Sequence, residues 1–532
     1  MLWTEVNAKM RTFKWVVGLS CAAAFLWSGA SRAQEDRGDW SVSGADPAQS
    51  GWQKSESILG RENASSQVKF LWKIKLGEPS KDPRDFSEPL LAGRLINAQG
   101  FKDIVYWSSA DTLYAVDSEL GTLIWKKQFS TKASATDSGC SPSRLSLFIE
   151  PPQVINFHAR RRRPNGPKPV EQPAAQANER RLGVAPGGGY FGLKGVYALT
   201  ADGMLHEQVM NTGADFAPPV RFLPAANSRS YGLNILGKEV YAATGRGCGG
   251  VANGIWSLDM ASPDYHVTSL ATPGLRPLAL TGPVLSPDGT AFLVTGGGSS
   301  NPSAGVNAGS VIALSKDLKV QDWYTPAGGV GNYESVSPVT FEHKEKQLLV
   351  APGKDGTIAL LDAASPGGAD HHTPLFETAP VAKPGAKHSW DGFATWQDKD
   401  GSAWVFASVS TEVISTENSL KRNGSTPHGA IVAFRVDDSG QLALRPVWVS
   451  RDMVNPAPPR IANGVVIALA GGDASTHATL YMLNAATGEE LYSSKNEIST
   501  SAEYSGVSVG DSHAFFTDCD NVLYSFGIGM EH

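Results

Sequence analysis

One short phrase recurs along this chain at intervals of roughly forty to eighty residues, and it constrains the fold more than any other feature. Each copy is an apolar run rich in Val, Ile, Leu and Tyr, the composition of a buried β-strand. The eight copies are LYAVD at 113–117, VYAL at 196–199, IWSLD at 255–259, VIAL at 311–314, IALLD at 358–362, IVAF at 431–434, LYMLN at 480–484 and LYSF at 523–526. A period of this length indicates one supersecondary unit repeated in space.

The residues around each copy predict the rest of the unit. A turn follows the phrase, and glycines such as Gly121 and Gly488 supply the positive φ that tight turns need. A further strand follows in several units and ends in an aromatic residue, as at Trp125, Trp323 and Trp448. Most copies are also preceded by another short apolar strand. Three or four antiparallel strands per unit, repeated radially, form the blades of a β-propeller.

The two ends of the repeat predict how the ring closes. The last copy has no aromatic strand after it, whereas FLWKIKL at 70–76 is a strand of the missing type near the start. Pairing these two segments would complete a blade and remove an exposed sheet edge. We therefore expect an all-β, eight-bladed β-propeller of four-stranded antiparallel blades, closed by pairing of N- and C-terminal strands. Seven blades is the alternative, because the second unit is divergent.

The first residues have the pattern of an export signal. Basic residues precede an apolar run at 15–27, and the small residues of SRA at 31–33 offer a cleavage site before Gln34. The run is short for a membrane-spanning helix. We interpret 1–33 as a signal peptide, with either Met1 or Met10 as the true start, and expect an exported protein without a stable membrane span, periplasmic or extracellular.

Composition and charge divide the chain after the predicted signal peptide into a lead-in, a propeller and an insertion. Residues 34–66 are a polar N-terminal lead-in carrying Trp40 and Trp52, and 67–530 form the propeller. A basic, Pro-rich insertion at 150–189, with RRRR at 160–163, interrupts the second unit. The net charge is −6, with a pI near 6.0. Neither this balance nor one arginine tetrad favours a nucleic-acid partner.

Cysteine usage leaves two arrangements open. Cys21 lies in the predicted leader, and Cys140, Cys248 and Cys519 remain. Three cysteines allow at most one intramolecular disulfide, and three unpaired thiols is the alternative. The sequence has no Cys-x-x-Cys-His motif, so we expect no covalently bound haem domain.

The repeat resembles that of the pyrroloquinoline quinone (PQQ) dehydrogenases. LYAVDSELGTLIW at 113–125 is close to their pattern, and DWSVSGAD at 39–46 looks like the opening of these quinoproteins. More specific phrases are similar to those of exported bacterial PQQ-binding-like β-propeller repeat proteins, in the quinoprotein alcohol dehydrogenase-like superfamily. They are TGRGCGG at 244–250, KDGTIALLDAAS at 354–365, GGADHH at 367–372, WDGFATW at 390–396 and NPAPP at 455–459. The same repeat occurs in non-enzymatic propellers such as the outer-membrane assembly lipoprotein, so the resemblance implies a fold rather than a reaction.

If the chain is a quinoprotein, the resemblance implies PQQ and Ca²⁺ as cofactors and assigns roles to particular residues. Arg246 and Lys354 could hold the carboxylates of the cofactor, Cys248 shares the glycine-rich turn of Arg246, and Trp390 could stack on the flat ring system. Each also has a structural interpretation: a strained turn with a buried thiol, a common Lys-Asp-Gly turn, and an aromatic residue that packs the blade.

The predicted chemistry would rest on acidic and imidazole groups. Asp391 could be the base that takes the proton of a substrate hydroxyl, with His388 beside it as a second catalytic candidate. Glu334 is the candidate metal ligand, since Ca²⁺ prefers carboxylate oxygens. The adjacent Cys-Cys pair of the larger alcohol dehydrogenases is not present in this sequence.

Two classes of function therefore remain open. One is an exported propeller that binds a small ligand or a protein at its channel or rim. The other is a PQQ- and calcium-dependent dehydrogenase that oxidises an alcohol or sugar and passes electrons to an external acceptor. The expected discriminator is whether Arg246, Lys354, Asp391 and Glu334 converge with Trp390.

Overall fold

The computed structural model describes most of the chain beyond its first 37 residues. The described residues are 38–77, 86–97, 100–130, 145–150, 195–224, 230–272, 275, 281–296, 307–326, 336–385, 390–415, 417, 419–503 and 505–529. They belong to one compact unit made of Gly38–Pro151 and Val170–His532. The predicted signal peptide, nearly all of the insertion at 150–189, and the site candidates Glu334 and His388 lie outside the described residues.

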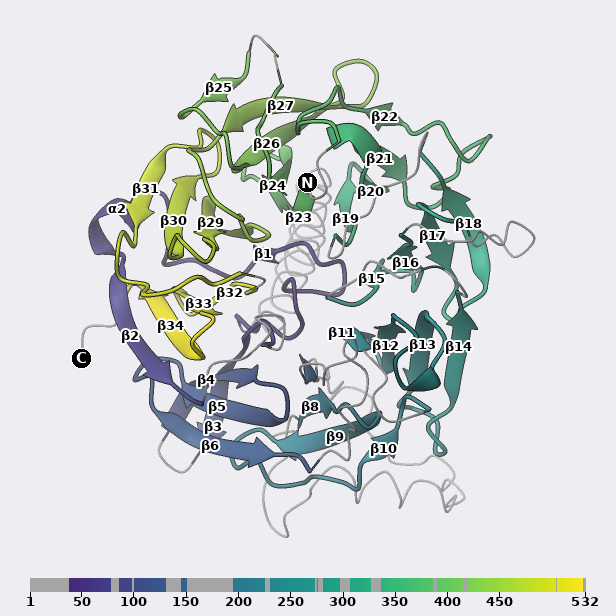
Figure 1. The fold of residues 1–532 in the computed structure, drawn as a ribbon, viewed down its shortest axis with the longest axis vertical. Coiled ribbons are helices and arrows are strands. Elements are labelled where there is room, and N and C mark those ends of the chain that lie inside the picture. Colours follow the sequence, from purple (N-terminus) through teal and green to yellow (C-terminus); the bar gives the residue numbers. More distant parts are fainter. Residues whose placement is uncertain are drawn as a thin grey trace, which may run out of the picture. The chain divides into compact units, whose positions relative to one another are not determined.

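Eight antiparallel sheets are arranged around a common centre, so the prediction of an eight-bladed all-β propeller is confirmed (Figure 1). Only one short α-helix, α2 (Ala64–Gln67), occurs in the described residues. No helix in that part of the chain has the length and apolar character needed to cross a membrane. The innermost strands, from the first blade to the eighth, are β3 (Leu90–Asn97), β7 (Ser146–Ile149), β11 (Ser230–Leu236), β15 (Val284–Leu285), β19 (Val339–His343), β23 (Trp390–Gln397), β28 (Arg460–Ala462) and β32 (Ser508–Gly510).

The outer strands follow in the same order. The second strands are β4 (Gly100–Ser108), β8 (Gly195–Leu199), β12 (Glu239–Thr244), β16 (Ala291–Val294), β20 (Lys346–Pro352), β24 (Ala403–Val409), β29 (Val465–Ala470) and β33 (His513–Thr517). The third strands are β5 (Thr112–Asp117), β9 (Met204–Val209), β13 (Gly254–Asp259), β17 (Val311–Leu314), β21 (Ile358–Asp362), β26 (Ala430–Asp437), β30 (Thr479–Asn484) and β34 (Val522–Gly527). The fourth strands are β6 (Leu123–Gln128), β10 (Val220–Arg221), β14 (Val267–Ala271), β18 (Val320–Tyr324), β22 (Phe376–Glu377), β27 (Ala443–Val449), β31 (Glu490–Ser493) and β2 (Lys69–Lys75).

Two further short strands each add a parallel strand to one blade: β1 (Trp52–Gln53) pairs with β28, and β25 (Lys421–Arg422) pairs with β27. The repeated phrase forms the third strand in seven blades. In the second blade it forms β8, the second strand, and this is the divergence that the sequence signalled.

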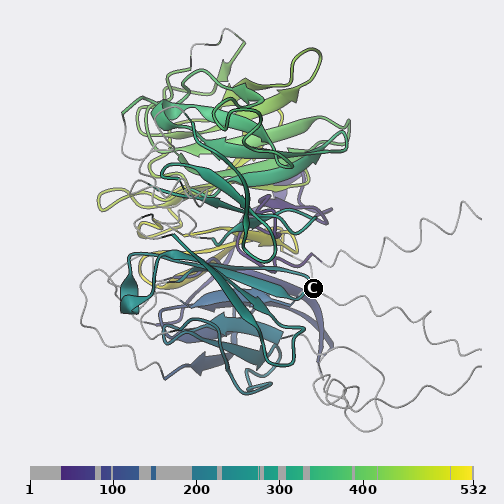
Figure 2. The ribbon, with the colours of Figure 1, turned by 90° about the vertical axis from the view of Figure 1, so that its right-hand side faces the viewer.

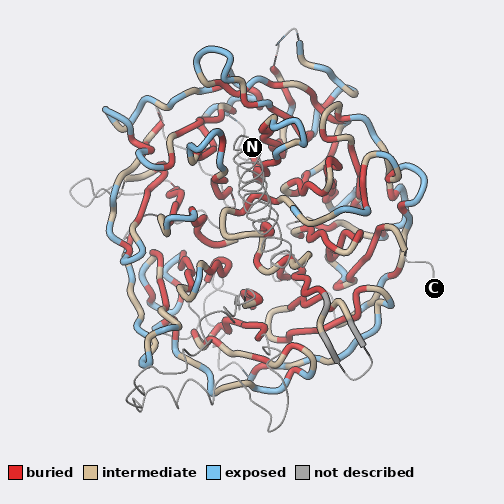
Figure 3. The backbone as a smooth tube through the Cα atoms, turned by 180° about the vertical axis from the view of Figure 1, so that it is seen from behind, coloured by how far each residue is buried: buried red, intermediate tan, exposed pale blue. Residues whose placement is uncertain are grey.

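The ring closes where the sequence predicted. Strand β2, from the N-terminal region, pairs antiparallel with β34, the last strand of the chain, and completes the eighth blade. Burial follows the blades: most residues of the second and third strands are buried, with β9 as the least buried of them, and exposed residues lie around the perimeter (Figure 3). Blades with two apolar faces pack against neighbours on both sides, which is why their central strands are continuous apolar runs rather than alternating ones.

A tryptophan–glycine contact repeats between neighbouring blades. The indole N–H of Trp72 donates to the carbonyl of Ser118 (2.8 Å), and its ring lies so close to Gly121 that a Cβ there would approach it to 2.4 Å. Trp125 has the same relation to Gly213, and Trp448 has it to Gly488. The aromatic residue at the end of one blade and the turn glycine of the next therefore form one joint, because only glycine leaves room for the ring.

The lead-in crosses the centre of the ring (Figure 1). Innermost strands present an unpaired edge, whose buried backbone groups need partners. The lead-in supplies a partner to every blade. The pairs, from β3 to β32, are Trp40 N–Leu91 O (2.8 Å), Ser41 O–Ile149 N (2.8 Å), Pro47 O–Asn234 Nδ2 (2.8 Å), Pro47 O–Leu285 N (2.8 Å), Ala48 O–Thr340 N (3.4 Å), Ser50 O–Thr395 N (2.8 Å), Gly51 O–Ile461 N (2.8 Å) and Gln53 Nε2–Val509 O (3.0 Å).

A buried ion pair anchors this segment. Glu88 and Arg460, with side chains 4% and 3% exposed, are joined by a 2.9 Å contact between Oε2 and Nη2. The other oxygen of Glu88 accepts from the indole of Trp40 (2.8 Å) and from the amide of Gly44 (3.0 Å). Arg460 also donates from Nε to the carbonyl of Val507 (2.9 Å). One ion pair thus joins the lead-in to the first, seventh and eighth blades.

We predict that Glu88→Gln lowers the free energy of unfolding by about 3 kcal/mol, because it leaves the Arg460 charge buried without a counter-charge. The glutamine carbonyl can still accept from Trp40 and Gly44, so the loss reports on the ion pair. Urea unfolding followed by tryptophan fluorescence measures it.

The matched control is Glu412→Gln, which removes the exposed pair between Glu412 and Lys383 (3.2 Å, side chains 51% and 61% exposed). This change should cost less than about 1 kcal/mol. Equal losses in the two variants would show that the Glu88 pair is not an anchor.

Candidate functional site

The two ends of the strands differ in how the chain connects them. In each four-stranded antiparallel blade, the second strand connects to the third, and the fourth strand to the next blade, at one end of the strands. We call this end the loop face. The first strand connects to the second, and the third to the fourth, at the other end, which we call the turn face. Figure 2 shows the blades from the side, between these two faces.

Long connections gather on the loop face, as at 295–310, 325–338 and 494–507. Most connections on the turn face are short, as at 237–238, 463–464 and 511–512, and the longer ones there are 150–194, 210–219 and 363–375. Binding and catalytic residues concentrate on loops held by a rigid scaffold, so the loop face is the candidate functional face.

Asp391 lies on this face at the beginning of β23. The register between β23 and β24 pairs Trp390 with Val409 and Gly392 with Ser408, so Asp391 is the additional residue of a β-bulge. Bulges redirect side chains and are frequent beside active sites. The hydroxyl of Ser410 donates to Oδ2 of Asp391, and burial raises the pKa of this carboxyl group to about 7. The group could therefore take up or release a proton near neutral pH.

The neighbouring backbone explains the sequence at this bulge. A Cβ at Gly392 would lie 2.7 Å from Cβ of Pro458, so glycine is needed where the two segments meet. The WDGFATW phrase at 390–396 and the NPAPP phrase at 455–459 therefore pack against each other. Sequence reasoning did not find Ser410. Its position directly after an apolar strand was the available signal, but this signal is shared by many surface serines.

Trp390 is covered by protein. Its side chain is 1% exposed, belongs to the core cluster of the fourth to sixth blades, and packs against Phe393 with ring centroids 5.9 Å apart. The indole Nε1 has no hydrogen-bond partner among the described groups. In this position neither face of the ring is open to a flat cofactor.

Arg246 and Cys248 lie in the loop after β12, in a turn with several left-handed residues. Arg246 is exposed and has φ +65°, and a 3₁₀ turn, η3 (Cys248–Gly250), follows it. Cys248 is buried and forms a disulfide bond, whereas Cys519 is a free thiol. Of the two arrangements left open by the cysteine count, the one with a disulfide is therefore the one that occurs.

Lys354 begins a second 3₁₀ turn, η5 (Lys354–Gly356), in the loop after β20. The strand order places Arg246, Lys354 and Asp391 on the same loop face, on the third, fifth and sixth blades respectively. Their assignment as cofactor-binding and catalytic residues, like that of Cys248, Trp390, Glu334 and His388, stays a prediction.

The fold is similar to that of several solved quinoprotein structures. The quinohemoprotein alcohol dehydrogenase of Comamonas testosteroni matches with a TM-score of 0.53 and 14% identity, covering 94% of this chain and 82% of that one. A quinohemoprotein alcohol dehydrogenase of Pseudomonas putida HK5 matches with 0.55 and 13%, covering 93% and 81%. A europium-containing methanol dehydrogenase matches with 0.54 and 11%, covering 93% and 99%.

At these identities the similarity shows the fold and no more. No family model and no curated protein sequence matches the chain. The class defined is the eight-bladed β-propeller with a quinoprotein dehydrogenase-like fold, and activity must be argued from the side chains.

We predict that Asp391 makes stability depend on pH. Its pKa is about 7 when folded and about 4 when unfolded, so between these values only the folded state holds the proton. The free energy of unfolding should therefore fall as pH rises from 5 to 7.5, by about 2 kcal/mol relative to Asp391→Asn. Urea titrations at a series of pH values measure the difference.

Ser410→Ala is the control, because it removes the hydroxyl and keeps the buried carboxyl group. The pH dependence should persist in that variant. Parallel pH curves for the native protein and Asp391→Asn would show that Asp391 titrates as an ordinary carboxyl group.

Proposed function

We propose that this chain is an exported propeller that binds a small ligand or a protein on its loop face. The observation that carries the proposal is the route of the lead-in, which hydrogen-bonds to the innermost strand of every blade. The lead-in therefore provides hydrogen-bond partners for the innermost strands around the axis. The long connections of the loop face remain as the adaptable surface for recognition.

The state of the cysteines supports the exported location. Cys248 is disulfide-bonded, and structural disulfides persist in oxidising compartments such as the periplasm and the cell exterior. The basic segment and apolar run at the start of the sequence point the same way.

The second candidate function is a PQQ- and calcium-dependent dehydrogenase, and Asp391 is the observation in its favour. A carboxyl group whose pKa is raised to about 7 by burial has the property required of a general base. PQQ, if bound, would supply the electron-accepting quinone. Against this candidate stands Trp390, whose ring would have to leave the blade core before it could stack on a cofactor.

Calorimetric titration of the purified protein with PQQ, with and without Ca²⁺, separates the two candidates. We expect no saturable heat at cofactor concentrations of tens of micromolar, because the predicted stacking residue is buried. Saturable binding near one equivalent that requires Ca²⁺ would overturn the proposal in favour of the dehydrogenase, and an alcohol and sugar screen with an artificial electron acceptor would follow.

Site-specific photo-crosslinking tests the binding face directly. A photoreactive phenylalanine analogue in place of Arg246, which is exposed on the loop face, should give a discrete adduct when cells that naturally make the protein are irradiated. The mass of the adduct tells a protein partner from a small ligand.

The control position is Lys316, exposed in the turn after β17 on the turn face, which should give no adduct. Equal labelling at both positions, or none at Arg246, would contradict recognition by the loop face.

A further inference from the structure

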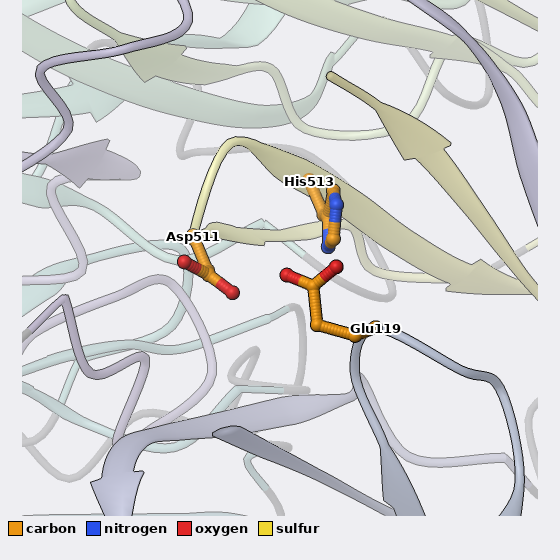
Figure 4. Close-up of side chains that lie close together, drawn as sticks. All are labelled: Glu119, Asp511 and His513. Carbon is orange, nitrogen blue, oxygen red and sulfur yellow. The ribbon is translucent and has the colours of Figure 1, made fainter. Parts of the chain in front are cut away.

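Three potential metal ligands meet on the turn face, at the joint between the last blade and the first. Glu119 lies in the turn between β5 and β6, Asp511 in the turn between β32 and β33, and His513 begins β33. One ligand atom from each lies within 4.8 Å of the others. In Figure 4 the imidazole points toward the Glu119 carboxylate, with the Asp511 carboxylate beside it.

His513 is the unusual member of this group. Its side chain is fully buried, at 0% exposure, and neither Nδ1 nor Nε2 has a hydrogen-bond partner among the described groups. A buried polar atom without a partner costs roughly 1–3 kcal/mol. The ring is also held in place by its neighbours, because a Cβ at Gly527, its partner across the ladder, would lie 2.7 Å from Cδ2. An imidazole fixed in this way needs an electron-pair acceptor or a proton donor at the cluster.

The second unusual member of the group is Asp511. Its Oδ2 atom is buried and has no hydrogen-bond partner among the groups that the structure describes. The carboxyl groups of Asp103 and Glu119 lie beside that of Asp511 and interact with it, so three acidic side chains are crowded at this point. Neutral imidazole and carboxylate are the forms that bind metals.

We propose that Glu119, Asp511 and His513 bind a divalent transition-metal ion, with Zn²⁺ as the ion that fits the ligand set. One imidazole nitrogen with carboxylate oxygens is typical of Zn²⁺ and related borderline ions, whereas Ca²⁺ and Mg²⁺ prefer oxygen ligands alone. A bound cation satisfies the unpartnered His513 nitrogen and Asp511 oxygen together and neutralises the crowded carboxylates.

The position gives the ion a structural role. Glu119 belongs to the first blade and Asp511 with His513 to the eighth, which is the blade that β2 and β34 complete. A shared ion would therefore hold together the two blades between which the ring closes. The site lies on the face opposite Asp391, so it is independent of the function proposed for the loop face.

The test uses the purified, tag-free protein after treatment with EDTA. We expect calorimetric titration to show one Zn²⁺ per chain, Ca²⁺ to bind at least tenfold more weakly, and Zn²⁺ to raise the midpoint of thermal unfolding. Substitution by Co²⁺ should give visible d–d bands that report nitrogen and oxygen ligands.

Variants at two positions on the turn surface avoid the risk of unfolding that a change at His513 carries. Glu119→Gln and Asp511→Asn should each weaken Zn²⁺ binding at least tenfold and remove the Co²⁺ bands. Asp520→Asn, an exposed acid at the opposite end of β33, is the control and should leave both unchanged.

Two outcomes would overturn the proposal. One is the absence of stoichiometric Zn²⁺ binding by the native protein. The other is Zn²⁺ binding that is equal in Glu119→Gln, Asp511→Asn and Asp520→Asn, which would identify an adventitious surface site. If the native protein binds no Zn²⁺, and metal-free Asp511→Asn is more stable than the metal-free native protein, the cluster shares a proton instead of binding a metal.

Discussion

The propeller depends on how the inner edges of its blades are satisfied. Eight innermost strands present backbone groups toward the axis, and each would lose hydrogen bonds to water on burial without replacement. The lead-in bonds to backbone groups of seven innermost strands and to the Asn234 side chain of the third blade. The Glu88–Arg460 ion pair fixes the beginning of the lead-in to the first, seventh and eighth blades. Arg460 also lies over the ring of Trp40, with Cζ 5.7 Å from the centroid. A segment of low hydrophobicity thus becomes the shared centre of the fold.

The two faces of the propeller, on either side of this centre, have different proposed roles. The turn face carries short connections and the carboxylate–imidazole cluster at the closing joint, and its proposed role is to hold the blades together. The loop face carries the long connections together with Asp391 and Arg246, and its proposed role is recognition. A common scaffold with adaptable loops is the usual way in which one fold supports many functions.

Much of the fold was predictable, because it rests on local pattern. The repeated apolar phrase predicted the strand positions, and the orphan strand at 70–76 predicted closure with the last strand, which the pairing of β2 and β34 confirms. The candidate site was less accessible. Glycine-rich turns and a Trp-Asp-Gly phrase indicated the loop face, but the burial of Trp390, the disulfide of Cys248 and the Ser410–Asp391 contact depend on neighbours from other segments.

The repeat in the sequence predicted eight blades, with seven as the alternative, and the orphan strand predicted the closure of the ring, because periodicity and edge pairing are properties of the chain. Which side chains contact one another depends on the tertiary structure and could not be read from the sequence. Glu119 and His513 are separated by nearly the whole propeller in sequence, and Glu88 and Arg460 by 372 residues. Ring closure brings both pairs together. No local pattern carries this information, since an acidic residue in a turn looks the same whether its partner is water or the opposite end of the chain.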